Sequence, residues 1–132
     1  MVDANILVAA VLGSTTGAHF DVISGRRSLI TSEAAIEEAY RVIGHVRPND
    51  LAVLESLLDL VTIIAEEDVA DEDRTVAEMA LKNAPVSRDG SVTHAHRLAL
   101  AWTVDANLWS HDRDFAGTGW PSWSTPNLLA AV

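Results

Sequence analysis

The chain has 132 residues, a formal net charge of −10 and no cysteine. This length predicts one domain over residues 1–132 with a sizeable core, and the missing cysteines exclude disulfides and thiolate metal sites. The acidic balance argues against a broad basic surface for nucleic acid. The longest apolar runs are too short to cross a bilayer, and the start lacks the basic segment of a signal peptide. We therefore expect a globular, cytoplasmic protein.

The first third of the chain predicts a strand, a helix and a second strand. The apolar run Val2 to Val8 predicts a central strand that enters a short helix. Thr15 or Thr16 is a suitable N-cap for a helix that ends near Ser24. Ser28 to Thr31 then predicts a short strand.

The middle of the chain carries the clearest helical pattern. Ser32 is a suitable N-cap, and apolar residues recur at spacings of three and four up to Val46. Pro48-Asn49-Asp50 ends this helix and precedes a second one over Leu51 to Leu58. Val61 to Ala65 is rich in β-branched residues and predicts a third strand.

The last part of the chain continues the alternation of helices and strands. Helices are predicted over Arg74 to Lys82 and Thr93 to Thr103, with short strands at Asn107 to Ser110 and Ser122 to Ser124. Such alternation predicts an α/β fold with a mainly parallel sheet and helices on both faces.

Three acidic residues lie where such a fold would gather them, namely Asp3, Glu38 and Asp112. Asp3 and Asp112 flank short strands expected at the centre of the sheet, and sites in parallel sheets lie beyond the carboxyl ends of strands. Acids that repel one another are stable together only if a cation lies between them. A hard divalent metal is the usual cation, which points to metal-assisted phosphodiester chemistry.

Several segments together resemble the PIN-domain ribonucleases. They are Asp3-Ala4-Asn5-Ile6-Leu7, Ser32 followed by Glu38, Leu98-Ala99-Leu100-Ala101, the segment from Leu108 to Phe115, and the tail from Gly117 to Thr125. The resemblance covers essentially the whole chain. It implies a three-layer α/β/α Rossmann-like fold and metal-dependent cleavage of RNA. Many bacterial members are similar to VapC-type toxins, so it also implies a small antitoxin protein as partner.

The resemblance assigns roles to individual residues. Asp3, Glu38 and Asp112 match the first, second and fourth acids of the family, which implies that they hold Mg²⁺ or Mn²⁺ and are catalytic. Asn5 and Ser110 match the polar residues that support these acids.

His94 occupies the position where the family has its third acid, four residues before Leu98. Imidazole suits transition metals better than magnesium, and it can also act as a base or bind a phosphate. The same substitution is equally compatible with a weakened enzyme, or with a degenerate PIN domain that binds RNA or protein. A phosphoryl-transfer fold with Asp3 as nucleophile fits less well, because no second carboxylate follows two residues later.

Contacts with other molecules are predicted at a few further residues. Arg113 and Arg97 are expected to contact the RNA, and Asp114 is expected to support the turn beside them. The helix from Ile36 to Val46 and the helix after it carry enough apolar surface for a homodimer. No contact with a membrane is expected.

Overall fold

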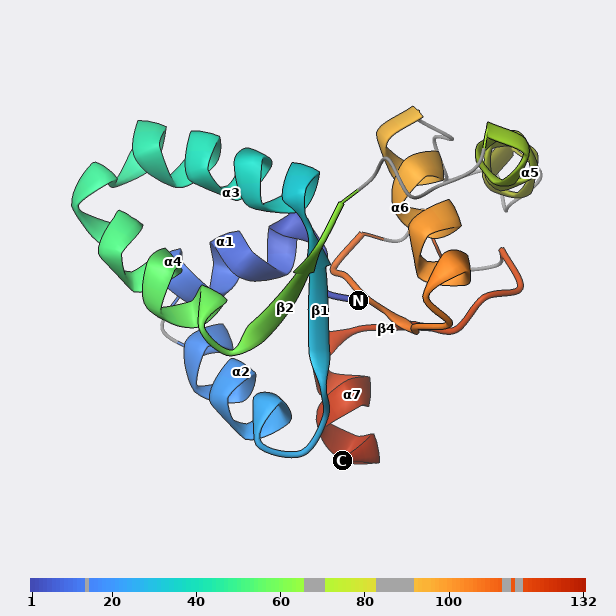
Figure 1. The fold of residues 1–132 in the computed structure, drawn as a ribbon. Helices are drawn as coiled ribbons and strands as arrows, with labels where there is room; N and C mark the ends of the chain where they lie inside the picture. The colour runs from blue at the N-terminus through green and yellow to red at the C-terminus, as the bar shows by residue number, and fades with distance from the viewer. Residues whose placement is uncertain (14, 66–70, 83–91, 113–114, 116–117) are drawn as a thin grey trace.

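The computed structural model of the chain shows short parallel strands between helices (Figure 1). It describes residues 1–13, 15–65, 71–82, 92–112, 115 and 118–132. In chain order the elements are α1 (Ala4–Leu12), α2 (Thr16–Ser24), β1 (Leu29–Ser32), α3 (Glu33–Val46), the short 3₁₀ helix η1 (Pro48–Asp50), α4 (Leu51–Leu58), β2 (Val61–Ile64), α5 (Asp71–Lys82), α6 (Val92–Thr103), β3 (Leu108–Trp109), β4 (Ser122–Trp123) and α7 (Thr125–Ala131).

The strands form two parallel pairs that Val2 connects. β1 pairs with β2, and β3 pairs with β4. The Val2 backbone N–H donates to the Ile30 carbonyl at 2.7 Å, and Val2 also forms a parallel bridge with Trp109. The described strands therefore run side by side in the order β2, β1, Val2, β3, β4, and the predicted parallel sheet is confirmed.

Helices cover both faces of this sheet. α1, α3 and α4 lie on one side of β1 and β2, and α6 lies on the other side with α5 packed against it (Figure 1). Two groups of buried side chains match these layers. Ile6, Leu7, Phe20 and others fill the first, and the second is built around α6 and Phe115. The arrangement is a three-layer α/β/α fold, as predicted.

The expected strand over Val2 to Val8 is wrong, because α1 already begins at Ala4. The Asp3 carboxylate accepts a hydrogen bond from the Ala4 N–H at 2.8 Å and caps the helix. A short apolar run is compatible with either a buried strand or a buried helix, so its periodicity could not separate the two. Only Val2 contributes to the sheet, and the first acid therefore lies at a helix N-terminus.

The C-terminal helix α7 was missed. Ser124 caps it, since its hydroxyl accepts a hydrogen bond from the Asn127 N–H at 3.4 Å. Pro126 lies in the first turn, where a missing N–H costs nothing. No helix was predicted after the strand at Ser122 to Ser124, although proline in a first turn favours a helix start.

α1 and α2 are both rich in apolar residues. Their largest apolar side chains are inside the protein, since Ile6, Leu7, Phe20 and Ile23 are each 0% exposed. No single helix among the described residues is long and apolar enough to cross a membrane. Taken together, α1 and α2 reach that length and apolar character, but they are bent by 119° relative to each other.

The amino group of Met1 is buried and donates to the Asn107 carbonyl. Burial lowers the pKa of this ammonium from 8.0 to about 5. In a chain that carries a free amine at Met1, the unfolded state therefore binds more protons than the folded state between these two values. The free energy of unfolding should then rise from pH 5 to pH 8, by up to about 4 kcal/mol at about 1.4 kcal/mol per pKa unit.

Urea denaturation at several pH values measures this effect, and an N-terminally acetylated chain is the control because its terminus cannot titrate. The dependence attributed to Met1 is the difference between the two curves. An identical pH dependence in both chains would contradict the prediction.

Candidate functional site

Asp3 is the buried centre of the site, with 1% of its surface exposed. Its backbone N–H donates to the Trp109 carbonyl at 3.0 Å, so the sheet holds it beside the end of β3. One carboxylate oxygen, Oδ1, caps α1, and the other, Oδ2, accepts a hydrogen bond from the Ser110 hydroxyl at 2.6 Å. A buried carboxylate is stable only with such partners.

Ser110 links Asp3 to the segment that follows β3. Its hydroxyl oxygen accepts hydrogen bonds from the Asp112 backbone N–H at 3.0 Å and from the Asn5 side-chain amide at 3.1 Å. The Asn5 side-chain oxygen Oδ1 accepts in turn from the His111 backbone N–H at 3.1 Å. Asn5 and Ser110 thus tie the start of α1 to the backbone around Asp112.

Arg97 connects Asp3 to Glu38. Arg97 Nη1 lies 2.7 Å from Asp3 Oδ1, and Nη2 donates to Glu38 Oε2. Asp3 caps α1, Glu38 belongs to α3 and Arg97 belongs to α6, so three elements meet here. We call Asp3, Glu38, Arg97 and Ser110 the acidic site.

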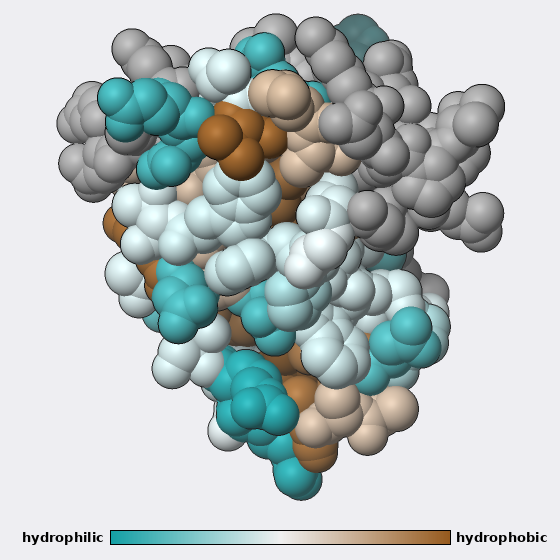
Figure 2. Space-filling model, turned by 90° about the vertical axis from the view of Figure 1, so that its right-hand side faces the viewer, coloured by the Kyte–Doolittle hydropathy of each residue, from teal (hydrophilic) through white to brown (hydrophobic). Residues whose placement is uncertain are grey.

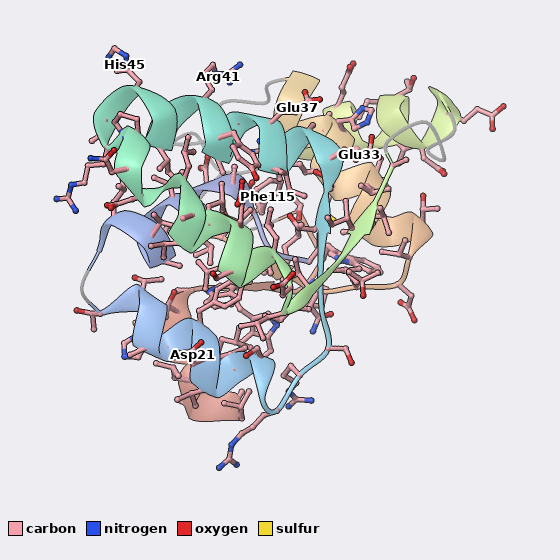
Figure 3. The ribbon with its side chains drawn as sticks, turned by 60° about the vertical axis from the view of Figure 1, so that its left-hand side comes forward. Asp21, Glu33, Glu37, Arg41, His45 and Phe115 are labelled. Carbon is pink, nitrogen blue, oxygen red and sulfur yellow. The ribbon has the colours of Figure 1, made fainter. Side chains whose placement is uncertain are left out.

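The sequence of α3 explains why Glu38 turns inward while its acidic neighbours do not. Ser32 caps the helix, with its hydroxyl 3.1 Å from the Ala35 N–H, and the buried residues Ala35, Ala39 and Ile43 mark the inner face. Glu38 adjoins that face and is half-buried. The exposed residues Glu33, Glu37, Arg41 and His45 recur at every fourth position along the outer side of the helix (Figure 3).

Arg97 is a charged residue inside an otherwise apolar helix face. Only 6% of its surface is exposed, and its neighbours Leu98, Ala99 and Leu100 are fully buried. Its Nε lies in the interior without a hydrogen-bond partner among the residues that the structure describes. A buried arginine that loses its ion pairs is strongly destabilising, so the two carboxylates are needed to keep Arg97 in this position.

The remaining predicted residues lie partly outside the described residues. His94 belongs to the first turn of α6, but the structure does not describe its side chain. Arg113 and Asp114 lie outside the described residues. Asp112 is half-buried. Arg97 was expected to contact RNA, yet its guanidinium is buried against Asp3 and Glu38. RNA would reach it only if these carboxylates released it.

As arranged, the described side chains do not fit a divalent ion. Both Asp3 oxygens and one Glu38 oxygen already accept hydrogen bonds or ion pairs. Within the described residues, no three His, Asp or Glu side chains are placed to hold a metal. Magnesium requires several free oxygen ligands in near-octahedral geometry. Arg97 supplies the positive charge that the sequence had led us to expect from a metal.

The role of Arg97 was missed, although the sequence contains a signal for it. Arg97 precedes the apolar run Leu98-Ala99-Leu100-Ala101 on a predicted helix. Arginine is almost never buried unless it is paired. Acids that need a cation and an arginine that needs acids were therefore both visible, but nothing in the sequence placed them together.

One cavity of the described structure lies outside the acidic site. It has a volume of about 460 Å³ and lies beside Val2, Leu29, Trp109 and Leu128. Asp3, Glu38 and Arg97 do not line it. This cavity and the acidic site are therefore separate features.

The parallel sheet between two helical layers, with an acid at the end of its central strands, defines a three-layer α/β/α protein with a candidate site beyond the strand ends. A family model described as a PIN domain matches residues 1–132, and the chain belongs to the PIN-domain family. PIN domains are generally metal-dependent nucleases that act on RNA. A search of curated proteins returned no match.

Proposed function

We propose that the chain is an endoribonuclease of the PIN-domain kind, acting at Asp3, Glu38 and Asp112. The observation that carries this proposal is the meeting of Asp3 and Glu38, from separate elements, at one cationic group. Asp112 lies next to the same site, because its backbone N–H donates to the Ser110 hydroxyl, which itself donates to Asp3. These contacts support the assignment of the three acids to one site.

The proposed cofactor is Mg²⁺ or Mn²⁺, but the acidic site must first change. The ion needs oxygens that Arg97 and Ser110 now occupy. His94 in place of the third acid removes one negative charge, which weakens the attraction for magnesium. We therefore expect a weakened activity, with His94 as a further candidate catalytic residue.

The proposed biological role is that of a cytoplasmic, VapC-like toxin neutralised by a small antitoxin protein. The net charge of −10 suits a basic partner. A homodimer is proposed through α3 and α4, where Val46 and Val53 are 56% and 46% exposed. The opposite face carries mostly weakly polar side chains, and its described part shows only small hydrophobic patches (Figure 2). Arg113 stays the proposed contact for RNA.

A second candidate is a degenerate PIN domain that binds RNA or protein without cleaving it. The ion pairs of Arg97 favour it, because they engage the acids that catalysis requires. His94 favours it too, since the family has a carboxylate there.

Replacing Asp112 by Asn should abolish RNA cleavage if the ribonuclease proposal is right. Loss of even an indirect metal partner costs about 10- to 100-fold, so we expect a loss of more than about 100-fold. The assay follows cleavage of an unstructured RNA with Mn²⁺ present and with Mn²⁺ chelated. Asp21→Asn is the matched control, because Asp21 is exposed on α2 (Figure 3), a helix that contributes no residue to the acidic site. Equal cleavage by both variants would contradict the proposal.

His94→Asp separates the two candidates in the same assay. If the unmodified chain cleaves weakly and His94→Asp cleaves faster, the chain is a weakened ribonuclease. If neither protein cleaves while the unmodified chain retains RNA in a binding assay, the second candidate is correct.

A further inference from the structure

We infer that Arg97 is a built-in substitute for the metal ion. Its guanidinium holds the position between Asp3 and Glu38 that a divalent cation would need, so the unmodified chain binds such ions weakly. Removing the charge of Arg97 should therefore create a metal site. This inference concerns ion binding alone, and it holds whether the chain cleaves RNA or only binds it.

The geometry of the ion pairs supports this inference first. The two η nitrogens of Arg97 are divided between the two acids, with Nη1 2.7 Å from Asp3 Oδ1 and Nη2 bonded to Glu38 Oε2. A guanidinium can present two parallel donors to one carboxylate, but here it bridges two carboxylates from different helices. That is the contact a shared divalent ion would make, so ion and guanidinium compete for the same oxygens.

The charge of the cluster leads to the same conclusion. Arg97 contributes one positive charge against the two negative charges of Asp3 and Glu38. An uncharged side chain at position 97 would leave both carboxylates without their cation, and Asp3 is only 1% exposed. Like charges in a poorly solvated position repel strongly, and oxygen-rich acidic clusters are the preferred sites of hard divalent ions. The same change also frees Glu38 Oε2 and leaves the Ala4 N–H as the remaining described donor to Asp3 Oδ1.

Burial explains why the ion does not simply displace Arg97. The Arg97 side chain is 7% exposed, whereas that of Glu38 is 37% exposed. An ion that enters from the Glu38 side must push a charged side chain out of the interior, where its neighbours are packed. Binding of the divalent ion is therefore less favourable in the unmodified chain than in a chain with an uncharged residue 97.

Arg97→Met tests the inference, because methionine keeps an unbranched side chain and removes the charge. Mn²⁺ alone is the probe, measured by calorimetric titration and by thermal unfolding with and without the ion. We expect Arg97→Met to bind Mn²⁺ at least about tenfold more tightly than the unmodified chain, a difference of about 1.4 kcal/mol. Its melting temperature should rise with Mn²⁺, while that of the unmodified chain should hardly change.

Arg41→Met is the matched control. Arg41 is exposed on the outer side of α3 (Figure 3), so this variant makes the same change in net charge without touching the acidic site. It should bind Mn²⁺ like the unmodified chain. Adding Asp3→Asn to Arg97→Met should remove the gain, which places the new site at Asp3.

Equal Mn²⁺ affinity of the unmodified chain and Arg97→Met would overturn the inference, as would an equal gain in Arg41→Met. If Arg97→Met does not fold, Arg97→Gln decides the question. Glutamine is also uncharged, and its amide can still donate a hydrogen bond to one of the acids, so we expect Mn²⁺ affinity above that of the unmodified chain. An unchanged affinity of Arg97→Gln would then overturn the inference. RNA cleavage enters none of these measurements, so a failure of the proposed function is seen separately.

Discussion

Asp3→Asn is expected to lower the free energy of unfolding by about 3 to 5 kcal/mol, the usual effect of removing one partner from a buried ion pair. The side chains of Asp3 and Arg97 are 1% and 7% exposed, so water cannot solvate the Arg97 guanidinium once it has lost the Asp3 carboxylate. Asparagine is itself a good N-cap, and the start of α1 should therefore remain helical. The loss then reports the ion pair together with the Ser110 hydrogen bond, rather than the cap. Urea denaturation measures it.

Two further variants make this result specific. Glu37→Gln removes an acid from the exposed side of α3 (Figure 3) and should change stability by no more than about 0.5 kcal/mol. The double variant with Asp3→Asn and Arg97→Met should lose less unfolding free energy than the sum of the two single variants. Each single variant leaves one buried charge without its partner, whereas the double variant removes both members of the Asp3–Arg97 pair. An Asp3→Asn protein as stable as Glu37→Gln would show that the ion pair adds nothing to stability.

Phe20→Ala is expected to destabilise the protein by about 3 to 5 kcal/mol, as large-to-small changes of buried aromatics do. Phe20 is 0% exposed and stacks on Trp109, with ring centroids 5.5 Å apart. Trp109 directly precedes Ser110, and its ring N–H donates to the Thr125 hydroxyl at 3.0 Å. The cavity left by Phe20 would therefore lie under the strand that positions the acidic site.

Val22 provides the control on the same helix. It is 49% exposed, so Val22→Ala should cost less than about 1 kcal/mol. Phe20→Leu should recover part of the loss, because it refills much of the cavity. Both variants are measured by urea denaturation beside Phe20→Ala. Similar losses for Phe20→Ala and Val22→Ala would contradict the assigned packing.

Local patterns were sufficient for the middle of the chain. α3 and α4 begin and end close to the positions that capping residues and apolar spacing predicted. β2 (Val61–Ile64) coincides with the β-branched segment that predicted a strand. These features depend on residues a few positions apart, whose preferences add along the element. The alternation of helices and strands predicted the α/β class, and the resemblance to PIN domains added the three-layer Rossmann-like fold, which the family match supports over residues 1–132.

The two ends of the chain needed tertiary information. The apolar run after Asp3 is a helix because its side chains fill the core beside Phe20 and Trp109. A strand at this point would have kept the same residues buried, so hydrophobicity alone did not decide between them. α7 was likewise hidden by Pro126, whose effect on a helix depends on its position within it.

The acidic site shows the same division most clearly. The sequence by itself determined that Asp3, Glu38 and Asp112 were candidate acids and that gathered acids require a cation. The tertiary structure decided that this cation is Arg97, which lies 59 positions from Glu38 along the chain. A residue's own charge is a local property, whereas its partner depends on where the fold places α6 relative to Asp3 and Glu38. Burial then strengthens the pairing of Asp3 with Arg97, because both side chains lie in the low-dielectric interior.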